Sequence, residues 1–235
     1  MIEFLKNLLS KLGIFNVIRK IIVIPYYKYK SYMFYKYANT VFVKAIMSLN
    51  ETKIDYWLDF GTLLGAVREK DFIKHDMDID FGILLTEQTS ELEKNFYKNG
   101  FKKEKEIFLK KKGIKIYESY KYMNKINVDI YYYEQEKDYL IYYELLREPQ
   151  LSYGETIRLK GGLNVEMIKY PIFTSIEYEF KNIKCKIPSN YKEHLIISYG
   201  KDYMMPKKFY DIQENINRVK VIDELGILKK RFNIK

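Results

Sequence analysis

Helix signals recur in five segments of this chain, where apolar residues follow helical spacing or residues typical of helix ends stand at the boundaries. Thr62 is a candidate N-cap for the second segment, and Gly100 and Gly200 are candidate stops for the third and fourth. The last segment repeats isoleucine and valine at helical spacing. The five predicted helices cover residues 31–49, 62–69, 86–100, 189–200 and 210–226.

Strand signals lie between these helices, where apolar and polar residues alternate with a period of two. IDYWLDF (54–60) and MDIDFGILL (77–85) flank the second helix. Residues 101–134 predict three strands joined by turns at Gly113 and near Asn124. Helices followed by a mostly antiparallel or mixed sheet and then by helices predict an α+β fold.

The length of the chain, 235 residues with 47% hydrophobic residues, is enough for one main domain. We expect residues 51–235 to form it, ending in a helical part, with residues 1–50 as a preceding helical segment. The single cysteine, Cys185, excludes an internal disulfide and a thiolate zinc site. It alternates with lysines in IKCKIP, which predicts a buried strand residue, and this composition suits a reducing compartment.

The net charge of +10 is concentrated near the N-terminus, where residues 1–30 carry six lysines and arginines against one glutamate. Basic residues interrupt the apolar ones, which excludes a secretory signal and a membrane-spanning helix. The pattern in residues 1–24 instead predicts an amphipathic helix that lies on an anionic membrane surface or packs on the protein's own core. Both alternatives stay open, and this charge distribution favours a membrane surface over nucleic acid as a partner.

Three aspartates, Asp76, Asp78 and Asp80, occupy every second position just before and within a predicted strand. They share one face of that strand, and the apolar residues between them, including Met77, are expected to face the core. Neighbouring carboxylates about 7 Å apart repel one another, and a bound cation relieves this repulsion. Hard oxygen ligands predict Mg²⁺ or Mn²⁺.

Other residues of the sequence are candidates for binding the metal or a phosphate group. Asp129 is the lone acid on one face of INVDIYYY, so we expect it to supply a further metal ligand from a neighbouring strand. The Gly61–Thr62 turn lets a phosphate approach the backbone at a helix N-terminus. Arg68 either clamps a phosphate or forms a surface ion pair with Glu69 or Asp71.

These residues resemble the LicD family, whose pattern reads roughly W-x-x-x-G-T-L-L-G-x-x-R, then F-I-P-W-D-D-D-I-D. The string here is WLDFGTLLGAVREKDFIKHDMDID (57–80). NVDIYYYE resembles the family's V-D-I-F segment, and HLIISYGKDYMMP its L-x-x-x-Y-G-x-D-[WY]-M-x-P block, so the resemblance spans about residues 55–208. Lys74 and His75 replace the family's Pro-Trp, and Met77 replaces the middle aspartate. His75 therefore contacts phosphate or pairs with a neighbouring aspartate.

The resemblance implies a nucleotidyltransferase-like fold, in which a mixed β-sheet is flanked by helices, with N-terminal amphipathic helices and a C-terminal helix. It implies Mg²⁺ or Mn²⁺, held by the catalytic residues Asp78, Asp80 and Asp129, with Asp76 behind them. The donor-binding residues that it implies are Gly61, Thr62, Arg68, His75 and Lys207.

The activity that it implies is transfer of phosphocholine, ribitol phosphate, glycerol phosphate or a similar group from a CDP-alcohol donor. The acceptor would be a sugar hydroxyl of a cell-surface glycan or glycolipid, such as lipopolysaccharide or capsule, and CMP would be released. We expect the enzyme to lie at the cytoplasmic face of the membrane. The alternatives are a nucleotidyltransferase that moves NMP from an NTP to a small molecule or RNA, and a non-catalytic, basic, membrane-docked binding module.

Overall fold

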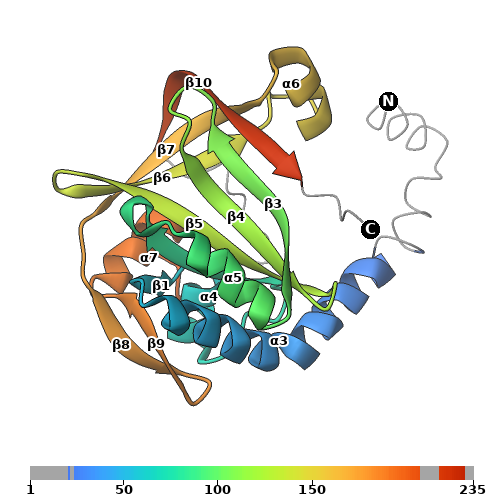
Figure 1. The fold of residues 1–235 in the computed structure, drawn as a ribbon, viewed down its shortest axis with the longest axis vertical. Coiled ribbons are helices and arrows are strands. Elements are labelled where there is room, and N and C mark those ends of the chain that lie inside the picture. Colours follow the sequence, from blue (N-terminus) through green and yellow to red (C-terminus); the bar gives the residue numbers. More distant parts are fainter. Residues whose placement is uncertain (1–20, 22–23, 207–216, 231–235) are drawn as a thin grey trace.

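A closed barrel of antiparallel strands, extended on one side by two further strands, forms the centre of the molecule (Figure 1). The computed structural model describes residues 21, 24–206 and 217–230. Its strands are β1 (Tyr56–Leu58), β2 (Asp78–Leu84), β3 (Phe101–Leu109), β4 (Lys115–Tyr122), β5 (Ile126–Glu136), β6 (Tyr139–Leu146), β7 (Leu163–Pro171), β8 (Ser175–Phe180), β9 (Ile183–Pro188) and β10 (Arg218–Lys230). Its helices are α3 (Ile24–Thr52), α4 (Phe60–Leu64) with the π-helix η2 (Gly65–Glu69), the 3₁₀ turn η3 (Leu85–Glu87), α5 (Ser90–Lys98), α6 (Tyr153–Lys160) and α7 (Tyr191–Tyr199).

The sheet order β1-β2-β5-β4-β3-β10-β7-β6 closes because β5 also pairs with β6. All six pairings around this barrel are antiparallel, whereas β2 joins β5 in parallel and β1 joins β2 antiparallel. Strands β8 and β9 form a separate two-stranded sheet. The predicted α+β class is confirmed, and its sheet is curled into a barrel with a short mixed extension.

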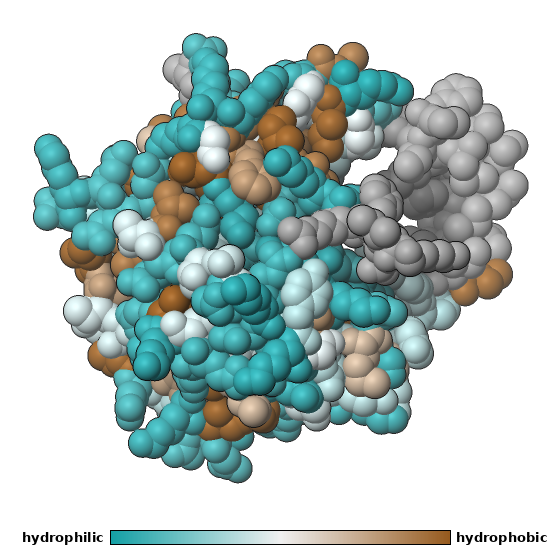
Figure 2. All heavy atoms as spheres, viewed as in Figure 1, coloured by the Kyte–Doolittle hydropathy of each residue, from teal (hydrophilic) through white to brown (hydrophobic). Residues whose placement is uncertain are grey.

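The main core lies where α3 and α5 cover the extension and the adjoining barrel strands. Val41, Phe42 and Leu49 of α3 are fully buried because apolar residues recur every three or four positions in the second half of this helix. They pack with Ile79 and Phe81 of β2 in one cluster. Hydrophilic residues cover most of the face seen in Figure 2. No helix in the described ranges is long and apolar enough to cross a membrane.

Most of the predicted elements are present. The helix predicted over residues 31–49 lies within α3, and the turns at Gly113 and near Asn124 separate β3, β4 and β5. Cys185 is buried on β9, as expected. Met77 is an exception, because β2 begins one residue later and leaves this side chain 37% exposed.

The predicted C-terminal helix over residues 210–226 is wrong from residue 218 onward, where the chain forms strand β10. This strand pairs with β3 on one side and β7 on the other, with an irregularity between Lys220 and Leu225. Helical spacing of apolar residues is a local signal, and two open strand edges elsewhere in the fold outweighed it. The predicted amphipathic helix over residues 1–24 lies outside the described residues except for Ile21 and Ile24, and so do residues 207–216.

Gly82 on β2 provides a test of how tightly the strand packs against Trp57. A Cβ added at Gly82 would meet the Trp57 indole at 2.2 Å, and Trp57 is 2% exposed. We expect Gly82→Ala to lower the free energy of unfolding by about 1–3 kcal/mol, because a buried indole has no room to move. Urea unfolding followed by Trp57 fluorescence measures this change.

Gly154→Ala is the matched control, because nothing lies within 4 Å of a Cβ at this position on α6. We expect it to change stability by less than about 1 kcal/mol, in the stabilising direction. Equal stability of the two variants would contradict the packing around Trp57.

Candidate active site

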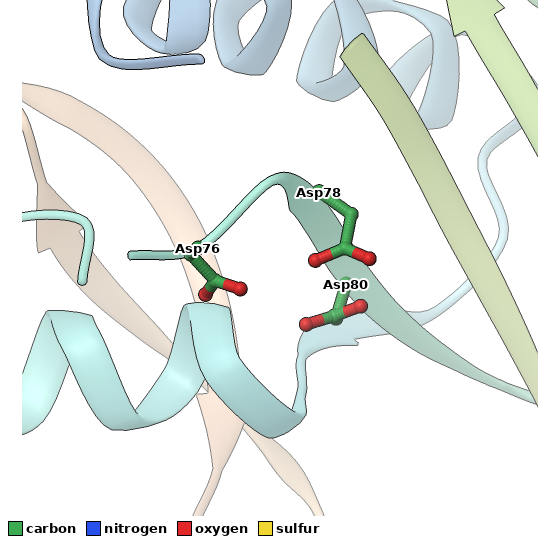
Figure 3. A group of neighbouring side chains, drawn as sticks. All are labelled: Asp76, Asp78 and Asp80. Carbon is green, nitrogen blue, oxygen red and sulfur yellow. The ribbon is translucent and has the colours of Figure 1, made fainter. Parts of the chain in front are cut away.

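The three aspartates of the acidic motif converge where the chain enters β2. Asp78 and Asp80 lie on the same face of this strand, and Asp76 lies beside them on the segment that leads into it (Figure 3). One carboxylate oxygen from each lies within 4.8 Å of the others. Asp80 is buried and the other two are half-buried, so this group can hold a cation.

Asp129 lies next to this group on the adjoining strand. Parallel pairing of β2 with β5 places Asp80 opposite Asp129 and Asp78 opposite Asn127. The flanking residues Val128 and Ile130 are fully buried on the other face, as the alternation predicted. The Ser119 hydroxyl donates a hydrogen bond of 2.5 Å to the Asp129 carboxylate. The structure therefore groups Asp76, Asp78 and Asp80, and it places Asp129 opposite Asp80 on the next strand, outside the group whose carboxylate oxygens lie within 4.8 Å of one another.

Burial and mutual repulsion make these carboxylates hard to ionise. Burial, and secondly the charge of Asp76, raise the pKa of Asp78 to about 7. Burial raises the pKa of Asp76 to about 6, and burial with the charge of Asp78 raises that of Asp129 to about 6. The pKa of Asp80 lies well above its usual range, because it is buried and has the other three as neighbours. Such a cluster binds protons or cations near neutral pH.

The start of α4 fixes the backbone of Asp80. The Thr62 hydroxyl accepts a hydrogen bond of 2.8 Å from the Asp80 amide, and the Asp80 carbonyl accepts one of 3.1 Å from the Asp59 amide. The predicted N-cap was wrong, because Asp59 caps the helix through the Phe60 amide. Thr62 is buried within the helix instead. Its side chain holds β2 in place at Asp80.

Gly61 makes room for Asp76. A Cβ added at Gly61 would meet the Asp76 Oδ2 atom at 2.4 Å, closer than real Cβ contacts come. The Asp76 carboxylate thus rests against the backbone of α4, and only glycine allows this approach. The preceding residue, Phe60, adopts a positive φ of 38°, which is unusual for a residue with a side chain. Backbone strain therefore lies at the helix start that supports the acidic group.

A buried polar cluster anchors this helix start, and the sequence interpretation missed it. Asp59, which is completely buried, lies 2.8 Å from His194 Nε2 and accepts a hydrogen bond of 2.6 Å from the Tyr133 hydroxyl. The His194 ring stacks on Tyr170 at 4.2 Å. Both Asp59 and His194 belong to sequence blocks that resembled the family, and this was the available signal.

Arg68 and His75 line a pocket that none of the four aspartates lines. Arg68 donates to the Tyr203 carbonyl at 3.0 Å and forms the expected ion pair with Glu69 at 2.8 Å, and its contact with a phosphate stays a prediction. Its side chain is only 11% exposed. His75 is exposed and shares with Arg68 the lining of a pocket of about 740 Å³ beside α3. Lys207 lies outside the described residues.

Tyr199, at the end of α7, is a further residue near the acidic group that the sequence interpretation did not single out. Burial raises its pKa well above the usual range, and the charges of Asp80 and Asp76 add to this shift. It stands at the start of the YGKDYMMP block, so this block begins near the aspartate motif.

Comparison with known proteins gives relatives in three mammals. The chain is 25% identical over 182 residues to the ribitol-5-phosphate transferase FKTN of Macaca fascicularis and of Homo sapiens. Each match covers 76% of this chain and 35% of the relative, so the chain spans about a third of those proteins. The corresponding Mus musculus protein is also 25% identical.

Among solved structures, the lincomycin-bound lincosamide antibiotic adenylyltransferase LnuA matches with a TM-score of 0.39 and 15% identity. That match covers 66% of this chain and 88% of LnuA. Residues 53–190, more than half of the chain, match the family described as LicD/FKTN/FKRP, nucleotidyltransferase domain. This protein therefore belongs to the LicD/FKTN/FKRP nucleotidyltransferase-domain family.

Proposed function

We propose that this protein is a metal-dependent transferase that moves a phospho-alcohol from a CDP-activated donor to a sugar hydroxyl of a cell-surface glycan and releases CMP. The observation that carries the proposal is the convergence of Asp76, Asp78 and Asp80 beside Asp129, in a chain of this family. The relatives named ribitol-5-phosphate transferase support a phosphorylated polyol as the transferred group. Phosphocholine, glycerol phosphate and similar groups are the alternative transferred groups, and the experiment below includes their donors.

The chemistry of the site fits Mg²⁺ or Mn²⁺. Its donors are carboxylate oxygens on two adjoining strands, and their raised pKa values reflect a concentration of negative charge that a divalent ion would relieve. Asp78, Asp80 and Asp129 are the proposed ligands. When bound, the ion neutralises phosphate oxygens and lowers the pKa of the attacking hydroxyl.

The reaction forms one bond and breaks one. The oxygen of the sugar hydroxyl bonds to the phosphorus that carries the alcohol, and the bond from that phosphorus to the bridging oxygen breaks, so that CMP leaves with this oxygen. The hydroxyl proton needs an acceptor near neutral pH. Asp76, which lies beside the proposed ligands Asp78 and Asp80, is the proposed acceptor.

Product analysis tests this function. Wild-type protein with Mg²⁺, a panel of glycan acceptors and CDP-ribitol, CDP-choline, CDP-glycerol or CDP-ethanolamine should release CMP from at least one donor. Asp80→Asn should lower turnover at least about 100-fold, because metal stabilisation is worth several kcal/mol. Asp138→Asn, at an exposed position in the β5–β6 turn, is the control and should keep full turnover.

Other products would identify the alternatives. Pyrophosphate released from CTP or ATP would overturn the proposal in favour of NMP transfer. Absence of turnover with every donor, together with equal Mg²⁺ affinity of wild type and Asp80→Asn, would indicate a non-catalytic module.

The raised pKa values also predict how pH affects metal binding and stability. A carboxylate whose pKa rises on folding stabilises the fold when protonated, and this contribution is lost as pH rises through the folded-state value. The metal-free protein should therefore lose stability between about pH 4 and pH 7, given a pKa of about 7 for Asp78. Mn²⁺ should bind more tightly across the same range with release of protons, measured by titration calorimetry in buffers of different ionisation enthalpy. An affinity independent of pH would contradict the assigned site.

Contact with an anionic membrane surface is part of the proposal. Residues 4–50 contain no aspartate or glutamate. In the described part of this stretch, the solvent-facing side of α3 exposes Tyr29, Tyr32 and Tyr35 by 58–61%, and Lys28 and Lys36 lie on the same side. Tyrosine is favoured at the interface between lipid and water, and lysine is attracted to anionic headgroups. A peripheral position at the cytoplasmic membrane face agrees with this surface.

Vesicle binding tests this contact. Deletion of residues 1–24 should weaken binding to vesicles containing phosphatidylglycerol at least about tenfold, since it removes four basic residues, and should leave turnover on a soluble acceptor intact. Tyr29→Ser should weaken binding further, whereas Tyr97→Ser, 45% exposed on α5, is the control. Unchanged sedimentation with the vesicles would exclude a role for this surface.

A further inference from the structure

A row of side chains crosses the barrel from the acidic site to a pair of lysines. Asp80 on β2 stands opposite Asp129 on β5, which stands opposite Ser119 on β4. Ser119 stands opposite Lys105 on β3, and Lys105 opposite Lys230 on β10. Residues directly opposite one another on paired strands share a face of the sheet. This face therefore changes from negative to positive within five adjoining strands.

Lys105 differs from the other lysines nearby in what its ammonium group contacts. Lys103 is buried in ion pairs with Glu93, Glu106 and Glu118. The Lys105 ammonium instead lies 4.8 Å from the centre of the Tyr117 ring, and within the described ranges no carboxylate pairs with it. Its charge is therefore available to a ligand.

Lys105 is close enough to influence the acidic site. Its charge opposes the rise in the pKa of both Asp129 and Asp78. The Tyr117 ring beneath its ammonium group belongs to a side chain whose hydroxyl interacts with Asp129. Asp129 and Lys105 are separated by one strand, which corresponds to about 9–10 Å between their backbones. A lysine side chain spans a large part of that distance.

A cavity of about 500 Å³ connects these groups. Its wall includes Asn127, Asp129 and Lys105, with Lys230 also lining it. The remaining wall combines five tyrosines, two glutamates and five isoleucines and leucines, so it offers hydroxyl groups and ring faces beside apolar side chains. These tyrosines and glutamates are Tyr117, Tyr131, Tyr142, Tyr143, Tyr153, Glu104 and Glu144. Such a wall suits a compact organic group that carries hydroxyls.

We propose that Lys105 binds a phosphate group of the substrate in this cavity, while the hydroxyl-bearing part of the same phosphate ester lies against the tyrosines. The opposite charges of the aspartates and of Lys105 give them different roles in binding the phosphate. Asp78, Asp80 and Asp129 would hold a divalent ion that neutralises charge on the substrate's phosphate, and Lys105 would add a point charge to the same phosphate. The inference rests on the proposed function, because it assigns the substrate's phosphate to the same acidic site.

Calorimetric titration of CDP into the Mg²⁺-loaded protein tests the inference. Lys105→Met keeps an unbranched side chain one atom shorter and removes its charge, and it should weaken CDP binding about tenfold to a hundredfold. Lys105→Arg should retain most of the affinity. Lys102→Met, on the exposed side of the same strand, is the matched control and should bind CDP like wild type. Unchanged affinity of Lys105→Met, or an equal loss in Lys102→Met, would overturn the inference.

A second measurement separates ligand binding from a structural role. Lys105→Met should bind Mg²⁺ alone at least as tightly as wild type, because removal of a nearby positive charge favours the cation, and its thermal unfolding should be unchanged. Loss of Mg²⁺ affinity or of stability in step with CDP affinity would indicate a structural role and overturn the inference.

The outcomes also separate this inference from the proposed function. If no CDP-alcohol is turned over but CDP binding still depends on Lys105, the proposed reaction fails and the phosphate site stands. If CDP-alcohol turnover is present and Lys105→Met leaves both turnover and affinity unchanged, the reaction stands and the phosphate site fails.

Discussion

The parallel pairing of β2 with β5 is the constraint on which the site depends. It sets Asp80 beside Asp129 and concentrates negative charge where burial already disfavours it. The surrounding structure holds this arrangement in place. Thr62 and the Asp59 backbone fix Asp80 from both sides, and Asp59 is held by His194 and by a tyrosine hydroxyl. A fold that holds several carboxylates this close together is suited to binding a cation.

Residues within one motif contribute in different ways. Gly61 provides space for Asp76, Thr62 supports the strand, and Arg68 ties the helix end to Tyr203. The sequence suggested donor contacts for all three, and in the structure two of these side chains make contacts within the protein. A motif thus contains residues that support a site as well as residues that bind its ligand. Residue type alone does not tell which residues have which role.

Short-range pattern predicted much of the fold and of the acidic group. Alternation placed Asp78 and Asp80 on one face, and the buried neighbours of Asp129 identified its face as well. Features that depend on contacts between segments far apart in the sequence could not be predicted from such patterns. The β10 strand, the contact of Asp59 with His194 and the position of Lys105 beside the acids depend on which strands and helices meet. The spacing of apolar residues within a segment does not indicate which strand or helix that segment will contact.

The late position of β10 in the sequence also affects when the barrel can close. This strand fills the gap between β3 and β7, and it contributes Leu228 and Lys230 to the lining of the tyrosine-rich cavity. Pairings between residues so far apart in sequence close slowly, because the intervening chain must first be ordered. During synthesis the acidic strands emerge long before this wall does. Closure of the barrel therefore sets the moment at which a nascent chain completes the wall of this cavity.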